Sequence, residues 1–175
     1  MRIAVYLGST SGNDPVFEEY AERIGQMLAR NGHTLVYGGA DGGMMGKLAA
    51  SVLKNGGHVI GVIPEFFMKR AFQGLDELIT VKTMSERKQI MMDLSDGFIA
   101  LPGGPGTVEE ITEIISALRI GLFRKPCVIF SPNGYYDSLR MQYDQMLEEG
   151  FLSLEERCRF EFVETVSEVQ KVLGI

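Results

Sequence analysis

The segment from Leu101 to Glu110 (LPGGPGTVEE) combines three glycines, two prolines, a threonine and two glutamates in ten residues. It follows an apolar run that predicts a strand and precedes a helical pattern that we expect to begin near Thr107. Free backbone N–H groups and the helix dipole make such a helix start a good phosphate site. We therefore predict that the turn binds phosphate through Gly103, Gly104, Gly106 and Thr107.

The end of this segment also fits a purely structural role. Thr107 and Glu110 have the spacing of a capping box, with Thr107 as the N-cap and Glu110 as the third helical residue. Taken alone, these two residues leave a cap and a functional carboxylate equally open. A cap does not need three glycines and two prolines before it, so the whole string favours a ligand site.

A basic pair, Arg87-Lys88, lies in the string MSERK that opens a predicted helix over Met84–Ser95. We expect Thr83 or Ser85 to cap this helix, which places both cations near its first turn, where they oppose the dipole. A solvated surface pair would explain them, and so would an anionic ligand. The helix precedes the strand that leads into the glycine-rich turn, so the topology allows the two motifs to meet.

Two further junctions between a strand and a helix are rich in glycine, namely LGSTSG at Leu7–Gly12 and VYGGADGGMMG at Val36–Gly46. Because glycine lacks a Cβ atom, such loops let backbone approach a ligand closely. Each junction alone is a weak signal, and tight turn geometry explains much of it. We add these candidate substrate-binding residues: Gly8, Ser9, Gly38, Gly39 and Met84.

Short apolar runs alternate with longer amphipathic stretches along the chain, which predicts an α/β fold. The runs are near-continuous in Val, Ile, Leu and Phe, as in parallel strands covered on both faces. We expect one domain over residues 1–175, a Rossmann-like doubly wound parallel sheet of about six or seven strands flanked by helices. The predicted strands are Ile3–Leu7, Thr34–Tyr37, His58–Ile63, Glu77–Val81, Gly97–Leu101, Pro126–Phe130 and Phe160–Val163.

The predicted helices cover roughly Phe17–Leu28, Leu48–Leu53, Met84–Ser95, Val108–Leu122, Tyr135–Glu149 and Ser167–Leu173. Ligands of such folds bind at the carboxyl ends of the strands. The glycine clusters border strands, so several of them could converge on that edge.

The composition excludes some classes of function. A formal net charge of −6 argues against nucleic acid as a partner. Two cysteines do not make a disulfide framework, and the N-terminal run is too short for a signal or membrane segment, so we expect a cytoplasmic protein without membrane contact. No Cys/His grouping has the spacing of a metal site.

The two main motifs resemble those of the LONELY GUY (LOG) family of cytokinin riboside 5′-monophosphate phosphoribohydrolases, formerly mislabelled lysine decarboxylases. The family's Pro-Gly-Gly-x-Gly-Thr-x-x-Glu motif stands here as Pro102–Glu110, and its Met-x-x-Arg-Lys motif as Met84–Lys88. Supporting stretches, including Asn133-Gly-Tyr-Tyr136, follow in the same order over essentially the whole chain.

The resemblance implies hydrolysis of the N-glycosidic bond of a nucleoside 5′-monophosphate, such as AMP or N6-prenyl-AMP, to free base and ribose 5-phosphate. Arg87 and Glu110 match the family's catalytic pair, and Gly103–Thr107 matches its phosphate site, to which Lys88 would add a cation. The resemblance implies no metal or organic cofactor, and a homodimer or higher homo-oligomer. The base, and whether the role is cytokinin production or nucleotide salvage, stay open.

The sequence departs from the family pattern at three places. Ser85 stands where the family often has His, and Asp41 stands in place of Ser in a Gly-Gly-Gly-Ser string. Lys69-Arg70 lies in the loop Glu65–Gly74, which resembles part of the wall on the base side, where the family often has an acidic residue. These differences concern the base rather than the phosphate.

Cleavage of a glycosidic bond passes through an oxocarbenium-like sugar, which a nearby carboxylate stabilises. We expect a depressed pKa for Glu110 at a helix N-terminus, so that it acts as an ionised stabiliser and not as a proton donor. A non-catalytic carrier of a phosphorylated ligand, such as the molybdenum cofactor, is the alternative, because it would keep the turn without needing Glu110.

Overall fold

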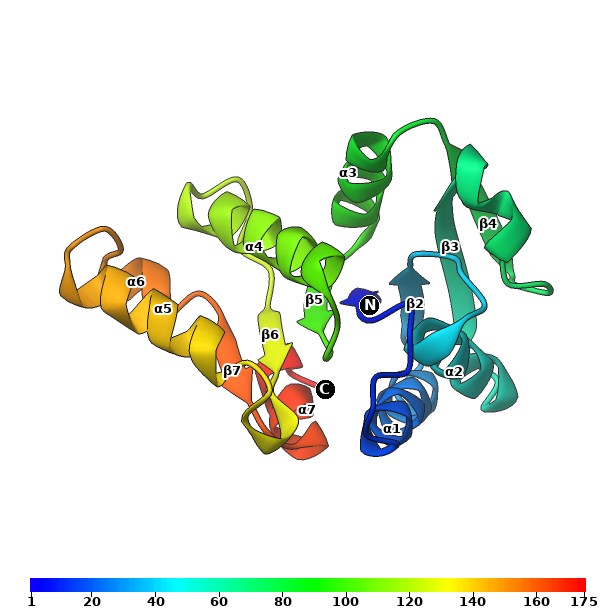
Figure 1. The fold of residues 1–175 in the computed structure, drawn as a ribbon, viewed down its shortest axis with the longest axis horizontal. Coiled ribbons are helices and arrows are strands. Elements are labelled where there is room, and N and C mark those ends of the chain that lie inside the picture. The colour runs from blue at the N-terminus through cyan, green and yellow to red at the C-terminus, as the bar shows by residue number, and fades with distance from the viewer.

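The computed structural model describes residues 1–175 and contains one sheet of seven parallel strands in the order β4-β3-β2-β1-β5-β6-β7 (Figure 1). The strands are β1 (Arg2–Tyr6), β2 (Thr34–Tyr37), β3 (His58–Pro64), β4 (Glu77–Val81), β5 (Gly97–Ala100), β6 (Cys127–Phe130) and β7 (Glu161–Val163). The chain builds the sheet outward from β1 to β4 and then returns to place β5 on the other side of β1.

Helices cover both faces of the sheet, as Figure 1 shows. The helices on one face are α1 (Val16–Arg30), α2 (Gly43–Lys54) and α7 (Val166–Leu173). Those on the other face are α3 (Met84–Leu94), α4 (Pro105–Arg119), α5 (Asp137–Glu148) and α6 (Leu154–Arg157). Two 3₁₀ helices, η1 (Glu65–Arg70) and η2 (Pro132–Gly134), follow β3 and β6.

The continuous apolar strands follow from this layering. In β1, Ile3 and Val5 pack in the core beneath α1 and α2, whereas Ala4 and Tyr6 pack in the core on the opposite face. Alternate residues of a strand point to opposite faces, so a strand covered on both sides needs apolar residues at every position.

The predicted fold class is confirmed, and all seven predicted strands are present with ends that differ by one residue at most. Two helices differ more, because α2 begins at Gly43 and not near Leu48, and α4 begins at Pro105 and not near Thr107. Proline is favoured at the first helical position, where its missing N–H would have no partner. The short helices η1, η2 and α6 were not predicted from the sequence.

The reversal of chain direction at β1 creates a topological switch point between β1 and β5, where ligands of such sheets usually bind. The junctions after β1, β2 and β5, all rich in glycine, lie at this carboxyl edge of the sheet. None of the helices has the length and apolar character that a membrane crossing requires.

Candidate active site

A cavity of about 290 Å³ opens at the carboxyl edge of the sheet. Its wall is built from the ends of β1, β2 and β3, from η1, and from the starts of α3 and α4. Most of the predicted site residues line it, namely Gly8, Ser9, Gly38, Met84, Arg87, Gly104, Gly106, Thr107 and Glu110. Three do not, namely Gly39, Gly103 and Lys88.

The turn before α4 is not a capping box. Gly104 is the N-cap, it makes no side-chain cap, and Thr107 is the third helical residue, buried at 4% exposure. Glu110 therefore lies one turn further along the helix than a capping residue would. The structural alternative for these two residues is wrong, because Pro105 starts the helix earlier than the threonine does.

The carbonyl groups of this turn are bonded, while its N–H groups are left open. The hydroxyl groups of Tyr136 and Tyr135 donate to the carbonyl oxygens of Leu101 (2.8 Å) and Gly103 (2.7 Å), and Gly8 N donates to Pro102 O (3.1 Å). The N–H groups of Gly103, Gly104 and Gly106 donate to no protein acceptor. The turn is thus held through its carbonyl groups, and its free N–H groups could donate to an anion.

Thr83, one of the two N-caps predicted for this helix, caps α3. Its hydroxyl accepts from Glu86 N (3.1 Å), and the Glu86 carboxylate accepts from Lys82 N (2.8 Å). This reciprocal bonding fixes where the helix starts and therefore which way Arg87 points.

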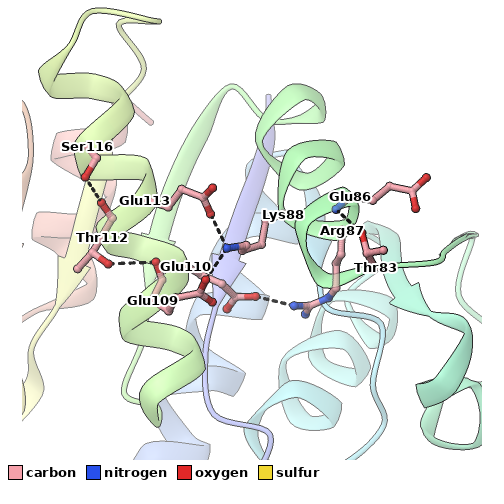
Figure 2. Close-up of polar contacts among 9 residues, drawn as sticks. All are labelled: Thr83, Glu86, Arg87, Lys88, Glu109, Glu110, Thr112, Glu113 and Ser116. Carbon is pink, nitrogen blue, oxygen red and sulfur yellow. Dashed lines mark hydrogen bonds and ion pairs between the residues drawn. The ribbon is translucent and has the colours of Figure 1, made fainter.

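Arg87 and Glu110 form a buried ion pair between α3 and α4 (Figure 2). Arg87 Nη1 lies 2.6 Å from Glu110 Oε1, and each residue is only 8% exposed. Arg87 Nε also donates to the carbonyl oxygen of Val62 in β3 (3.0 Å). Arg87 Nη2 and Glu110 Oε2 have no hydrogen-bond partner in the protein, and both residues line the cavity.

Gly38 at the end of β2 provides the space for the guanidinium. A Cβ atom at this position would lie 2.0 Å from Arg87 Nη2 and 2.4 Å from Met45 Cε. The backbone of Gly38 is not left-handed, so the requirement for glycine here comes from the close approach of Arg87 and not from backbone strain.

The pKa of Glu110 is raised, and the predicted depression is wrong. Burial of the carboxylate is the largest cause, and the charge and hydrogen bond of Arg87 oppose it without cancelling it. Glu110 lies in the second turn of α4 and faces the interior between two helices, where loss of water favours the neutral acid. A carboxyl group whose pKa moves toward neutrality exchanges protons more readily than an ordinary glutamate.

Lys88, the next residue on α3, points to a different pair of partners. Its ammonium contacts the carboxylates of Glu109 and of Glu113 (3.0 Å), and these partners raise the pKa of Lys88 (Figure 2). Lys88 joins α3 to α4 outside the cavity wall. Its contribution to phosphate binding stays a prediction.

Several residues of the wall were not among the site residues predicted from the sequence. Met45, Ile63 and Phe67 line the cavity with apolar side chains, and Arg70 lines it with a cation. The only signal was the likeness of Glu65–Gly74 to a wall on the base side. The role of Tyr135 and Tyr136 was also missed, because their hydroxyl groups reach a turn more than thirty residues away.

Of the residues that depart from the family pattern, only one lines the cavity. Arg70 lines it, whereas Lys69, Asp41 and Ser85 do not, and all four residues are exposed. Asp41 acts through its backbone, whose N–H donates to Arg70 O (2.9 Å).

Fold and site together define a Rossmann-like α/β protein with a glycine-rich helix start whose N–H groups are free and a buried arginine–glutamate pair. Solved structures share the fold. A molybdenum cofactor binding protein from Rippkaea orientalis superposes with a TM-score of 0.76 at 19% identity, covering 99% of this chain and 94% of that one. The molybdenum cofactor carrier protein of Chlamydomonas reinhardtii gives 0.73 at 20% identity, covering 99% and 98%.

Sequence comparison is more specific than the fold. The family described as "Possible lysine decarboxylase" matches residues 45–173. The cytokinin riboside 5′-monophosphate phosphoribohydrolase of Rhodococcoides fascians is 42% identical over 160 residues, which cover 90% of this chain and 81% of the relative. An Arabidopsis thaliana protein of that name is also 42% identical, over 87% of this chain and 71% of its own. The chain belongs to this family, the LOG family.

Proposed function

We propose that the protein hydrolyses the N-glycosidic bond of a nucleoside 5′-monophosphate and releases the free base and ribose 5-phosphate. The observation that carries this proposal is the buried Arg87–Glu110 pair in the same cavity as the open start of α4. The names of the relatives, which are phosphoribohydrolases of this kind, support it.

The substrate phosphate binds at the start of α4. Gly104 and Gly106 present free N–H groups there, and Thr107 lies beside them in the cavity wall. The positive end of the helix dipole adds to these donors. Binding at this remote group holds the ribose in place for the reaction at its C1′ atom.

Glu110 acts at the ribose. As the bond to the base breaks, positive charge develops on the sugar, and a carboxylate close to it lowers the barrier. Oε1 is held by Arg87, which leaves Oε2 to face the sugar or to orient the attacking water. As the bond to the base breaks, the water adds its oxygen to C1′; one of its protons stays on the new hydroxyl, and the other passes to the departing base nitrogen, directly or through Glu110.

Arg87 orients this carboxylate and contributes to the charge in the cavity. Its Nε bond to β3 and its Nη1 bond to Glu110 fix the plane of the guanidinium. The free Nη2 can donate to a ribose hydroxyl or to a phosphate oxygen.

The carrier alternative has less support. A carrier would bind its phosphorylated ligand at the turn but would not need a buried carboxylate beside it. The solved carriers are only about one-fifth identical in sequence, so their likeness concerns the fold alone.

We further propose that residues 1–175 form a single hydrolase domain that acts in the cytoplasm as a homodimer or higher homo-oligomer. Both cysteines are free, and exposed apolar side chains on η1, β4 and the start of α3 offer a surface for a second copy. Phe66, Met68 and Leu78 lie outside the cavity wall, whereas Phe67 and Met84 also line the cavity. Light scattering on the purified protein tests the assembly, and a monomeric mass at micromolar concentration would contradict it.

The decisive experiment is to compare base release from AMP, GMP and IMP by the parent protein and by Glu110→Gln. Losing a stabilising charge at a reacting centre typically costs on the order of 10²–10³ in rate. Glu113→Gln is the matched control, because Glu113 lies on the same helix, exposed and outside the cavity. Activity of Glu110→Gln within about threefold of the parent would remove Glu110 from the mechanism.

A further inference from the structure

Tyr135 follows η2 and bonds to the glycine-rich turn before α4. Its hydroxyl donates to Gly103 O at 2.7 Å. The N–H of the same peptide group belongs to Gly104 and donates to no acceptor in the protein. Since the C=O and N–H of a trans peptide group point in opposite directions, the bond on the oxygen sets the direction of this N–H. Gly104 lines the cavity and Gly103 does not, which agrees with an N–H on the cavity side of the turn.

Little else holds this peptide group in place. No heavy atom beyond the chain neighbours lies within 4 Å of the position that a Cβ atom of Gly104 would take. Glycine also adopts positive φ without steric cost, so a peptide group between two glycines can rotate and exchange the places of its C=O and N–H. After such a rotation the carbonyl oxygen would face the cavity and would repel a phosphate. The Tyr135 hydroxyl opposes this rotation.

The ring of Tyr135 is held on two sides, although the residue is 43% exposed. Phe17 of α1 meets it edge-on with the ring centroids 5.5 Å apart, and Tyr136 meets it edge-on at 4.8 Å. The backbone before it turns through Asn133 and Gly134, whose φ angles are positive (55° and 72°). Packing against α1 and the turn at η2 therefore set the position of the Tyr135 hydroxyl.

Tyr136 bonds to the same turn, but to a peptide group that has no N–H. Its hydroxyl donates to Leu101 O (2.8 Å), and the nitrogen of that peptide group belongs to Pro102. Tyr136 is 3% exposed, so loss of its hydroxyl leaves a buried carbonyl without a partner and costs stability. The two tyrosines thus separate the support of the turn from the orientation of a donor.

We propose that Tyr135 is a positioning residue for the substrate phosphate, because its hydroxyl keeps the N–H of Gly104 directed into the cavity. This inference rests on the proposed phosphate site at the start of α4 and adds to it a residue that lies outside the cavity wall. The hydrogen bond on Gly103 O also polarises the peptide group, which makes its N–H a stronger donor.

The test compares the parent protein with Tyr135→Phe, which keeps the ring and removes only the hydroxyl. Calorimetric dissociation constants for ribose 5-phosphate and for adenosine separate binding of the phosphate from binding of the rest of the nucleotide. We expect Tyr135→Phe to bind ribose 5-phosphate about tenfold more weakly, as when one hydrogen bond to a charged group is largely lost. Its affinity for adenosine, which has no phosphate, and its unfolding temperature should stay close to those of the parent.

Two other tyrosines provide matched variants. Tyr136→Phe removes the same atom from the neighbouring residue, and it should lower the unfolding temperature more than Tyr135→Phe while weakening ribose 5-phosphate less. Tyr20→Phe is the control, because Tyr20 packs on Phe130 outside the cavity and its hydroxyl has no hydrogen-bond partner in the protein. Tyr20→Phe should bind both ligands as the parent does.

The inference is overturned if Tyr135→Phe binds ribose 5-phosphate as tightly as the parent, or if it loses affinity for ribose 5-phosphate and adenosine by the same factor. It is also overturned if Tyr136→Phe weakens ribose 5-phosphate as much as Tyr135→Phe does, because both tyrosines would then act only through the stability of the turn. A parent protein that does not bind ribose 5-phosphate would have the same consequence. Base release from AMP is measured separately, so a failure of the proposed hydrolysis leaves the binding result to decide the role of Tyr135.

Discussion

Arg87 and Lys88 are neighbours in the sequence, and both form ion pairs between α3 and α4, yet the two pairs differ in almost every physical respect. Arg87–Glu110 is buried, lines the cavity and has one free atom on each partner. Lys88 has two partners, Glu109 and Glu113, whose side chains are 58% and 43% exposed. Consecutive helical residues point about 100° apart, so one step along α3 separates the buried pair from the one whose carboxylates are exposed.

The difference shows that burial, and not the presence of opposite charges, changes the chemistry of a carboxylate. Burial raises the pKa of Glu110 even beside an arginine, whereas the carboxylates of Glu109 and Glu113 remain exposed to water. A buried ion pair adds little net stability, because desolvation offsets its attraction, but it fixes the geometry of both side chains. An exposed cluster of charges also stabilises the fold only slightly, and its side chains change conformation easily.

Among changes that should affect one of the two ion pairs and not the other, Gly38→Ala is expected to have the largest effect on the reaction rate. The new methyl group would overlap Arg87 Nη2 and displace the guanidinium, and a displacement of about 1 Å in a catalytic group can cost on the order of 10²-fold in rate. Nothing comparable should happen to Lys88, which does not contact Gly38.

Steady-state kinetics with the best nucleotide, together with thermal unfolding, check this expectation for Gly38→Ala. We expect a large fall in kcat and only a small fall in the unfolding temperature. Equal kinetics in Gly38→Ala and the parent would show that Arg87 need not keep its position.

A change of pH is expected to have a smaller effect on kcat/KM. If ionised Glu110 is required, kcat/KM falls as the pH drops through its pKa, and the raised pKa places this acid limb above the ordinary glutamate value of 4.5. Measuring kcat/KM in steps of about half a pH unit, from about pH 4 to about pH 8, locates this acid limb. An acid limb below 4.5 would mean that Arg87 outweighs burial.

The smallest effect is expected from Lys88→Met, which removes the charge and keeps most of the apolar stem. Ion pairs with exposed partners contribute about 0.2–1 kcal/mol, so the free energy of unfolding should fall by no more than about 1 kcal/mol. Denaturant unfolding measures this loss, and KM for the nucleotide is measured beside it. A tenfold rise in KM would restore Lys88 to the phosphate site and would contradict its position outside the wall.

Much of the fold could be predicted because its signals are local. A strand covered on both faces must be apolar throughout, so β1, β2 and β5 are readable as continuous runs. The start of α3 was also readable, since a threonine followed three residues later by a glutamate is a capping pattern. The same pattern misleads at Thr107 because Pro105 begins the helix two residues earlier.

The site was predictable in part. The glycines and Arg87 follow from short motifs, but the environment of each group depends on elements far apart in the sequence. Arg70 enters the wall only because η1 bonds to the loop after β2. The turn before α4 is supported by tyrosines that follow β6.

The sequence by itself determined the parallel α/β sheet, the glycine-rich helix start and the presence of Arg87 and Glu110, because local patterns of polarity and turn chemistry encode these features. Only the tertiary structure decided that Arg87 and Glu110 share one buried pair, that the pKa of Glu110 rises, and that Lys88 points elsewhere. Burial and electrostatic partners are properties of packing between elements, and no local pattern specifies them.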